Sequence, residues 1–247
     1  MTRSIKARIR ILTYNIHKCI GGVDRRYDLD RIIEVIGQYR PDVAFLQEVD
    51  DDVPRSGHDR QVELIAEELD YPHAVFQKNV QLKQGHYGNA ILSRFRLDPQ
   101  VNLDLTFWMK KRRQALITRA HVAIGEHTRS LVLCNTHLGL AGFERTTQIK
   151  KILACQEIAH LHHDTPIIIG GDFNDVWSSH GRKQMFPCGF QCAVKRTKTF
   201  PAFLPVRSLD SIYYRGDLEL QDSFSGRTVL ARQASDHLPV VADFEIS

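Results

Sequence analysis

The sequence predicts a strand-rich α/β fold in which two β-sheets pack together and helices lie outside them. Strand-like apolar runs outnumber the stretches with helical periodicity. Several of these runs are almost continuously apolar, which is typical of strands that are buried on both faces. Because the runs do not alternate regularly with helices, two packed sheets fit the pattern better than one parallel sheet.

Three stretches have the i, i+3, i+4, i+7 spacing of apolar residues that indicates an amphipathic helix. The first covers 29–36, with Asp28 as its expected N-cap and Pro41 as its stop signal. The second covers 62–69, and the third covers about 143–162. The predicted strands, in chain order, are 9–14, 43–46, 90–93, 116–124, 131–135, 167–169, 209–214 and 240–244.

Composition excludes several broad classes of protein. Hydrophobic residues make up 43% of the chain and charged residues 25%, which are ordinary globular values and exclude a disordered chain. The net charge of +4 is too small to imply nucleic-acid binding by itself. No apolar run reaches the roughly 18 residues of a membrane span, and the basic first residues lack the apolar stretch of a signal peptide. We therefore expect a cytoplasmic protein without stable membrane insertion or an obligate protein partner.

Polar side chains follow several of the apolar runs at the point where each run ends. Asn15, Glu48, His137 and Asp172 all occupy such positions. A single polar residue after a strand only marks the return of the chain to water. Four such ends, each with a chemically useful side chain, predict a shared polar edge on a rigid scaffold, where functional sites are usually built.

The second half of the chain adds a carboxylate–imidazole pair. Asp172 and Asn174 are two residues apart, so in extended chain their side chains point to one face, where they could hold a water or a phosphate oxygen. Asp210 lies in an otherwise apolar strand, and a buried carboxylate is costly unless it is paired. An imidazole is the expected partner, and Asp236-His237 precedes the last strand.

Together these segments resemble the endonuclease/exonuclease/phosphatase family, which includes deoxyribonuclease I, abasic-site endonucleases, sphingomyelinases and inositol polyphosphate phosphatases. They occur in family order, and the resemblance extends over about 8–246 of a single domain spanning 1–247. The matching segments are 12–16, 42–48, 88–94, 135–138, 171–174, 209–212 and 235–240. The resemblance implies a deoxyribonuclease I-like, four-layer α/β sandwich of two mixed sheets, and hydrolysis of phosphate esters with a divalent metal.

The resemblance also implies the metal ligands. Glu48 is similar to the principal ligand of the family, and its hard oxygen donors suit Mg²⁺, with Mn²⁺ as an alternative. Asn15 would hold that carboxylate or a phosphate oxygen nearby. Asp236 is expected to be a second metal contact or a support.

The catalytic roles follow in the same way. Asp172 would orient and deprotonate the attacking water, and Asn174 would fix that water or the phosphate. His237, oriented by Asp210, would stabilise or protonate the phosphate as charge builds on it. His137 lies at the family position of an imidazole that contacts phosphate. These roles meet the general need of phosphoryl transfer for an in-line water and for neutralised oxygens.

Four further residues are candidates for substrate binding, each with a structural alternative. Asn89 could line the site or simply begin a strand. Arg112 and Arg113 follow Lys110-Lys111 in a basic loop that could grip phosphates or be only a solvated turn. Arg145 could reach the substrate or pair with a neighbour on its own helix.

The class of phosphate ester stays open at this stage. A phosphodiesterase acting on nucleic acid is favoured by the breadth of the family and by the basic loop. A phosphodiesterase or phosphatase acting on a phospholipid or small ester is the second reading, compatible with the apolar, proline-containing loop 199–205. The third reading is a non-catalytic binding module, which would be expected to have lost a core residue, whereas all of them are present.

Overall fold

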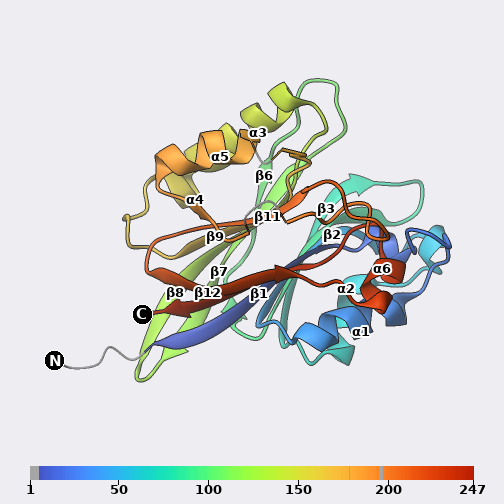
Figure 1. Ribbon diagram of the computed structural model, residues 1–247, viewed down its shortest axis with the longest axis horizontal. Helices are drawn as coiled ribbons and strands as arrows, with labels where there is room; N and C mark the ends of the chain where they lie inside the picture. Colours follow the sequence, from blue (N-terminus) through green and yellow to red (C-terminus); the bar gives the residue numbers. More distant parts are fainter. Residues whose placement is uncertain (1–5, 178, 195–196) are drawn as a thin grey trace.

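Two β-sheets packed face to face form the centre of the computed structural model, which describes residues 6–177, 179–194 and 197–247 (Figure 1). The first sheet has the strand order β12-β13-β1-β2-β4-β3, and the second has the order β10-β11-β9-β8-β7-β5, with β6 also paired to β7. The first sheet comprises β1 (Ala7–Asn15), β2 (Val43–Asp51), β3 (His73–Gln81), β4 (His86–Ser93), β12 (Leu218–Ser225) and β13 (Val240–Ile246). The second comprises β5 (Arg96–Leu97), β6 (Val101–Asp104), β7 (Gln114–Ile124), β8 (His127–His137), β9 (Ile167–Asp172), β10 (Gln191–Cys192) and β11 (Asp210–Arg215).

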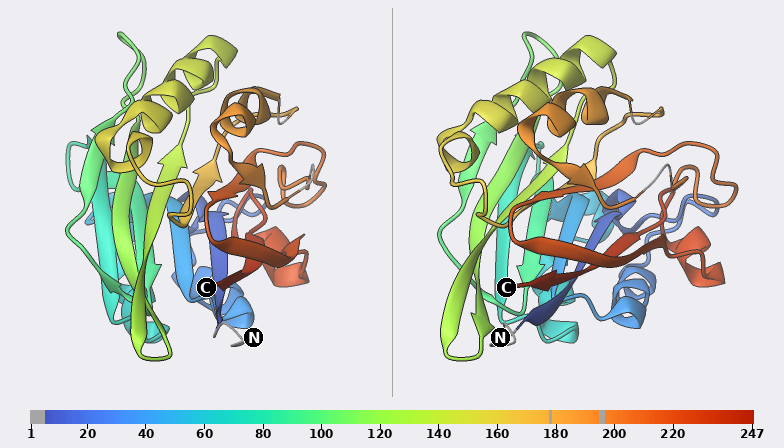
Figure 2. Two further views of the ribbon diagram at one scale, coloured as in Figure 1. Left: turned by 90° about the vertical axis from the view of Figure 1, so that its left-hand side faces the viewer. Right: turned by 60° about the vertical axis from the view of Figure 1, so that its left-hand side comes forward.

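Helices cover the outer face of each sheet (Figure 2). The first sheet carries α1 (Leu29–Tyr39), α2 (Gln61–Glu68) and α6 (Val229–Ala234). The second carries α3 (Gly142–Ala154), α4 (Gln156–Ala159) and α5 (Ser179–Met185). Short 3₁₀ helices are η1 (His17–Cys19), η2 (Pro54–Ser56) and η3 (Phe186–Cys188). This helix–sheet–sheet–helix order confirms the predicted fold class.

Both sheets are mixed. In the first, β1 and β2 are parallel and the other neighbours are antiparallel. In the second, β8 and β9 are parallel and the others are antiparallel. Parallel neighbours bring their carboxyl ends to the same edge of a sheet, so the ends of β1 and β2 meet on one sheet and those of β8 and β9 on the other.

Alternation along the central strands explains why the predicted runs are so apolar. In β1, Ile9 and Ile11 pack between the two sheets, whereas Leu12 and Tyr14 face the helices. The same alternation places Leu133 of β8 in the central layer. Because both faces of these strands are buried, the hydrophobic effect selects apolar residues at nearly every position.

Two of the predicted helices match closely, and the third was too long. Asp28 caps α1 as expected: its side chain accepts a hydrogen bond from the backbone N–H of Arg31 at 3.2 Å. The predicted third helix, 143–162, is interrupted at Cys155, which adopts extended backbone angles (φ −71°, ψ 154°), and its second part ends at Ala159. That residue separates α3 from the short α4, so the helical pattern continues across a break in the helix.

The sequence missed five strands, which are β3, β5, β6, β10 and β12. The reason is visible in β12, an edge strand in which only Leu218 is buried. A strand at the edge of a sheet needs no continuous apolar run, and its residues are exposed or half-buried. Among the described helices, none has the length and apolar character to cross a membrane.

Candidate active site

Strand pairing aligns three of the predicted site residues in one row across the second sheet. Asp172, the last residue of β9, lies opposite His137 of β8 and opposite Asp210 of β11. Asn15 ends β1 of the facing sheet, and its Nδ2 donates to Oδ2 of Asp172 at 3.2 Å. The predicted polar edge therefore exists, and this hydrogen bond joins the two sheets there.

The backbone conformation of Gly171 places Asp172 in this row. The φ of Gly171 is +144°, a conformation that residues with a side chain rarely adopt. A Cβ atom at this position would lie 1.9 Å from the carbonyl oxygen of Thr136 on β8. Glycine is required here because β9 passes against the backbone of its neighbour just before the carboxylate.

The carboxylate of Asp172 is buried and has contacts on both oxygens. Its Oδ1 accepts the backbone N–H of Asn174 at 2.9 Å, and its Oδ2 lies 3.4 Å from Nε2 of His137 and 3.8 Å from Nε2 of His237. Burial raises the pKa of Asp172, although the two imidazoles act in the opposite direction. The group is thus a stronger proton acceptor than a carboxylate in water.

His237 has the predicted carboxylate partner. Its Nδ1 donates to Oδ2 of Asp210 at 2.9 Å, and the same oxygen accepts a hydrogen bond from the hydroxyl of Thr199 at 2.5 Å. The ring of Phe200 packs against the imidazole with 5.0 Å between centroids. Burial lowers the pKa of His237, but Asp210 and then Asp172 outweigh it and raise the pKa to about 10. The imidazole is therefore protonated at neutral pH.

His137 has the opposite electrostatic character. Burial, followed by the charge of Arg113, lowers the pKa of His137 to about 4, although Asp172 and Glu48 act against this shift. Its imidazole is therefore neutral at pH 7. Asp172 thus lies between a neutral and a protonated imidazole, and the two can play different parts towards one substrate.

Glu48 lies at a kink in β2. The pairing of β2 with β4 shifts register between Leu46 and Val49, and Glu48 has a φ of +58°. A bulge of this kind re-aims a side chain at the rim of a sheet. Burial raises the pKa of Glu48, but the charge that His137 gains at low pH and the charge of Lys18 outweigh it and hold the pKa well below its usual range. Glu48 is thus an ionised carboxylate, and it forms an ion pair with Lys18.

Cations surround Tyr87 beside this carboxylate. The ammonium groups of Lys18 and Lys111 lie 5.7 Å and 5.0 Å from the centroid of its ring, and the guanidinium of Arg55 lies 5.6 Å away. The sequence analysis assigned no role to Tyr87, Lys18 or Arg55. Their grouping arises only when η1, η2 and β4 meet, and no local motif marks it.

The remaining predicted metal and catalytic residues have more specific contacts than the sequence indicated. Asn174 has a φ of +50°, and its Nδ2 donates to the carbonyl of Leu138 at 2.9 Å. Asp236 lies beside η1, with Oδ1 3.9 Å from Nδ1 of His17. Among the described contacts, none joins Asp236 to Glu48.

The substrate-binding predictions divide into three outcomes. Arg112 is exposed on the basic loop, whereas Arg113 is buried and close enough to lower the pKa of His137. Asn89 is buried in β4, and its Nδ2 donates to Gln77 at 3.4 Å. Arg145 donates to the main-chain carbonyl of Leu140 at 2.5 Å, so it supports the loop after β8. The described contacts of Arg145 do not include the pair on its own helix that was the structural alternative. Its contact with substrate stays a prediction.

Two supporting side chains escaped the sequence analysis. Thr199 shares Oδ2 of Asp210 with His237, and Gln47 donates to Asn135 of the facing sheet at 2.8 Å. Asn135 in turn donates to the carbonyls of Leu46 and Ala90 at 2.9 Å and 2.8 Å. These contacts fix the strand ends that carry the site. They join segments far apart in the chain, so spacing along the sequence gives no signal for them.

The donor set at this edge fits a divalent metal. Glu48 offers ionised oxygen donors, 17% exposed at the side chain, which suit a hard cation that keeps some of its water. Behind it, ligand atoms of Asp172, Asp210 and His237 lie within 4.8 Å of one another, and Oδ1 of Asp210 is buried without a hydrogen-bond partner. The partly accessible carboxylate of Glu48 is therefore the group that suits a divalent metal, whereas the carboxylates of the buried row already have His237 as their partner.

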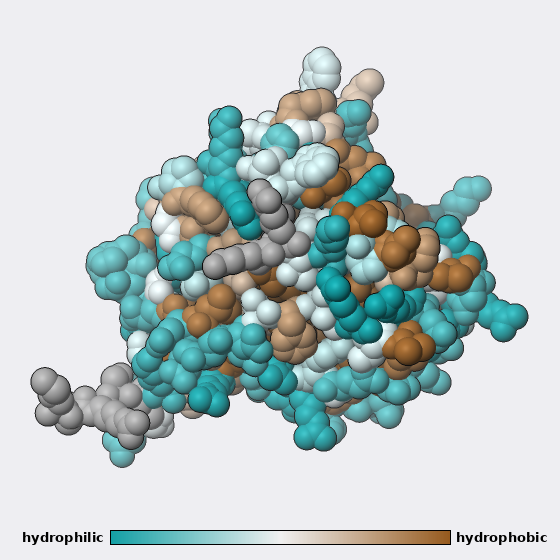
Figure 3. Space-filling model, viewed as in Figure 1, coloured by the Kyte–Doolittle hydropathy of each residue, from teal (hydrophilic) through white to brown (hydrophobic). Residues whose placement is uncertain are grey.

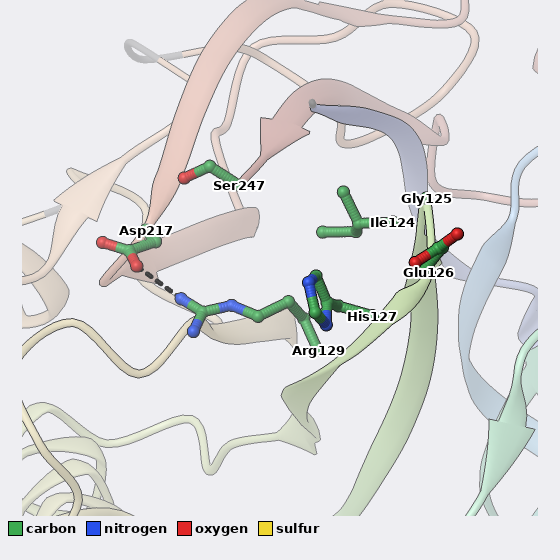
Figure 4. A pocket seen from close by; sticks show the side chains of 7 residues that line it. All are labelled: Ile124, Gly125, Glu126, His127, Arg129, Asp217 and Ser247. Carbon is green, nitrogen blue, oxygen red and sulfur yellow. Dashed lines mark hydrogen bonds and ion pairs between the residues drawn. The ribbon is translucent and has the colours of Figure 1, made fainter. Parts of the chain in front are cut away.

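A hollow at the far end of the molecule is a different feature (Figure 4). It measures about 860 Å³ and lies at the turn between β7 and β8, where Arg129 and Asp217 form an ion pair across it. β7 begins near the catalytic row and ends at this turn, so the length of the strand separates the two places. Among the described residues that line this hollow, only Arg129 and Asp217 form an ion pair, so the row around Asp172 is the better candidate.

Comparison with known proteins identifies the family. The sequence model of the Endonuclease/Exonuclease/phosphatase family matches residues 12–237, and the chain belongs to this family of hydrolytic phosphoesterases. The uncharacterized protein YbhP of Escherichia coli K12 is 26% identical over 256 residues, which cover 96% of both chains.

Solved structures share the fold. An endonuclease/exonuclease/phosphatase from Beutenbergia cavernae superposes with a TM-score of 0.81 at 23% identity, covering 99% of this chain and 72% of the other. The human Nocturnin catalytic domain, solved with a bound sulfate anion, has a TM-score of 0.75 at 21% identity, and both chains are covered completely. These structures extend the four-layer sandwich to proteins of diverse origin.

Proposed function

We propose that this protein is a divalent-metal-dependent phosphodiesterase that cleaves its substrate by in-line attack of water. The observation that carries the proposal is the buried row of Asp210, His237 and Asp172, with 2.9 Å and 3.8 Å between the imidazole and the two carboxylates. Buried charges are costly unless they are paired. Groups of paired, buried acids and bases with shifted pKa values occur mainly at functional sites. Family membership supports hydrolysis of a phosphate ester.

Glu48 would be the principal ligand of the metal, supported by Asn15 on the neighbouring strand, with Asp236 at the outer side of the site. Mg²⁺ fits these oxygen donors, and Mn²⁺ is the alternative. When bound, the ion neutralises charge on the phosphate oxygens and acts as a Lewis acid. In this structure the ammonium group of Lys18 forms an ion pair with the carboxylate of Glu48. A metal ion bound to Glu48 would therefore take the place of Lys18 as its positive partner.

Asp172 would orient the attacking water and accept its proton. Its raised pKa favours proton transfer, and hydrogen bonds from Asn15 and the backbone of Asn174 fix the direction of its oxygens. Asn174 carries its side chain on the same turn and would hold the water or a phosphate oxygen. This arrangement meets the requirement that a general base be held at hydrogen-bonding distance from the proton it removes.

His237 and His137 would act on the phosphate itself. The protonated His237 is suited to neutralise charge that builds on the phosphate oxygens, and Asp210 fixes its orientation through Nδ1. His137 is neutral and would contact the phosphate without adding charge. Arg113, buried beside His137, adds a fixed positive charge to this side of the site.

A panel of substrates tests the proposal. It contains bis-p-nitrophenyl phosphate, plasmid DNA, an abasic-site oligonucleotide, RNA and a phospholipid, each with magnesium, with EDTA and with the His237→Ala variant. We expect hydrolysis of at least one diester that both controls abolish. Hydrolysis that survives EDTA and His237→Ala would contradict the proposed mechanism. Complete inactivity on the panel would favour the alternative of a binding module with the same fold.

A further inference from the structure

Exposed apolar side chains gather around the candidate active site. We call the loops that surround it the site edge, defined as 16–28, 105–113, 138–143, 173–177, 197–209 and 226–239. These loops adjoin the ends of β1, β7, β8, β9, β11 and β13 that carry or border the catalytic row. The large apolar side chains exposed on them are Val23, Trp108, Met109, Leu140, Phe143, Trp177, Phe203, Leu204, Val206 and Val229.

The loop between β6 and β7 is the most prominent part of this surface, at the upper right of Figure 1. Trp108 is 92% exposed and Met109 is 98% exposed, which is close to the exposure of a free side chain. Phe107 and Phe143 pack edge to face behind them, with 5.4 Å between centroids, and the apolar hollow so formed measures about 680 Å³. An exposed apolar loop tip that is supported by packed aromatic rings is typical of a surface that binds a membrane or another apolar partner.

Exposed basic side chains flank the apolar ones along the chain. Lys110 follows Met109 directly, and Lys111 and Arg112 come next on the same loop. The same neighbourhood of apolar and basic residues recurs on three other loops of the site edge. It comprises Val23 with Arg25 and Arg26, Val206 with Arg207, and Val229 with Arg227. Figure 3 shows brown apolar side chains interspersed with teal ones over the right-hand side of the molecule.

We propose that the site edge docks on an anionic lipid surface, which presents the phosphate ester to the catalytic row. This inference rests on the proposed function, because it names where the substrate lies. Apolar side chains with adjacent Lys and Arg are the pattern of proteins that bind in the headgroup layer without spanning the bilayer. The apolar tips enter the acyl boundary, and the basic residues contact the anionic headgroups.

The composition of the surface favours lipid over single-stranded nucleic acid. Strand-binding surfaces stack bases on aromatic rings, and an aromatic side chain is needed for each stacked base. Six of the ten exposed apolar residues here are aliphatic, including Met109 at the loop tip and Leu204 on the opposite loop. Aliphatic side chains provide no stacking platform, but they dissolve in hydrocarbon.

Tryptophan fluorescence provides a direct test. The chain has two tryptophans, Trp108 and Trp177, and both lie on the site edge, 92% and 81% exposed. The His237→Ala variant is mixed with vesicles of phosphatidylcholine with or without phosphatidylglycerol, so that no substrate is consumed. We expect a blue shift of the emission and protection from iodide with the anionic vesicles. Lipids brominated in the acyl chain should quench the emission.

Matched variants locate the contact. Trp108→Ala with Met109→Ala should reduce co-sedimentation with anionic vesicles at least tenfold, whereas Phe186→Ala, which removes an exposed aromatic side chain from η3, should not. Lys110→Glu with Arg112→Glu should have a similar effect, whereas Arg96→Glu with Arg119→Glu, the same change of charge on β5 and β7, should not. Salt should weaken binding of the wild-type protein, because the basic residues contribute to it.

Three outcomes overturn the proposal. One is unchanged tryptophan emission with anionic vesicles, and the second is equal loss of binding in the site-edge and control variants. The third is stronger binding to a single-stranded oligonucleotide than to vesicles, lost with Trp108→Ala, which would assign the surface to nucleic acid. The proposed function is measured separately with soluble bis-p-nitrophenyl phosphate. Vesicle binding without any diester hydrolysis would overturn that function, and diester hydrolysis without vesicle binding would overturn only the docking surface.

Discussion

Asp172 and Asp210 are direct neighbours across β9 and β11, and the imidazole of His237 lies between their carboxylates. Two buried carboxylates side by side repel each other, and one protonated imidazole between them attracts both. This relationship explains why the pKa of His237 is raised to about 10 in spite of burial. It also makes the row an electrostatic unit, so that changing one member alters the other two.

Removing the imidazole should abolish most of the turnover. For His237→Ala we expect kcat for bis-p-nitrophenyl phosphate to fall about 10²–10⁴-fold, because the group acts mainly on the transition state. His121→Ala, at a half-buried histidine paired with Asp98 far from the row, is the matched control. A His237→Ala enzyme within threefold of the wild-type rate would remove this residue from the mechanism.

The Asp210→Asn variant should change how stability depends on pH. The pKa of His237 is about 10 in the fold and about 6.5 when unfolded, so its protonated form stabilises the native state. This contribution to the free energy of unfolding is complete below pH 6.5 and is lost as pH rises through 10. Denaturant titrations in EDTA between pH 6.5 and 10 should therefore show a steeper loss in the wild-type protein than in Asp210→Asn. Parallel curves would contradict the assigned pKa.

Glu48→Gln should weaken the binding of magnesium and leave the fold intact. The neutral amide keeps the shape of the side chain but removes the charge that attracts the ion, so we expect a higher magnesium concentration at half-maximal activity. Binding of Mn²⁺, followed by electron paramagnetic resonance, should weaken in parallel. Glu63→Gln, at an exposed position on α2, is the control. An unchanged magnesium titration would exclude Glu48 from the metal site.

Gly171→Ala should destabilise the protein strongly. The new Cβ would lie 1.9 Å from the carbonyl oxygen of Thr136, and φ is +144°. We expect a loss of more than about 1 kcal/mol in the free energy of unfolding, measured by denaturant titration. Gly57→Ala separates the two causes, because Gly57 has a φ of +66° but no atom within 4 Å of the added Cβ. Equal losses in both variants would show that close packing against β8 is not the reason for the glycine.

The central strands and most of the catalytic row could be predicted from the sequence. β1, β2, β8 and β9 are buried on both faces, so each is an apolar run whose end is marked by a polar residue. Edge strands such as β12 lack that signal, because one face and one backbone edge remain in water. The break of the third helix at Cys155 was not predicted, because periodicity does not register a local change of backbone angles.

The contacts at the site that could not be predicted are tertiary contacts between residues far apart in the sequence. Asp210 and His237 could be paired in advance because a buried carboxylate in a strand requires a partner. Thr199 could not, since its contact with Asp210 depends on how the loop before β11 folds back. Lys18 follows the first strand in sequence, yet only the bulge of β2 brings Glu48 to its ammonium group. For Arg145 the sequence suggested a partner on its own helix, whereas its guanidinium donates to the main-chain carbonyl of Leu140 in the loop after β8.

The most direct measurement of the central claim is turnover of Asp172→Asn with bis-p-nitrophenyl phosphate at saturating magnesium, together with Mn²⁺ binding to the same variant. The asparagine is nearly isosteric but cannot accept the proton of the attacking water. The account predicts a fall in kcat of about 10²–10⁴-fold with KM and Mn²⁺ affinity close to those of the wild-type protein. A variant that hydrolyses the diester at a rate near that of the wild-type protein would contradict the account.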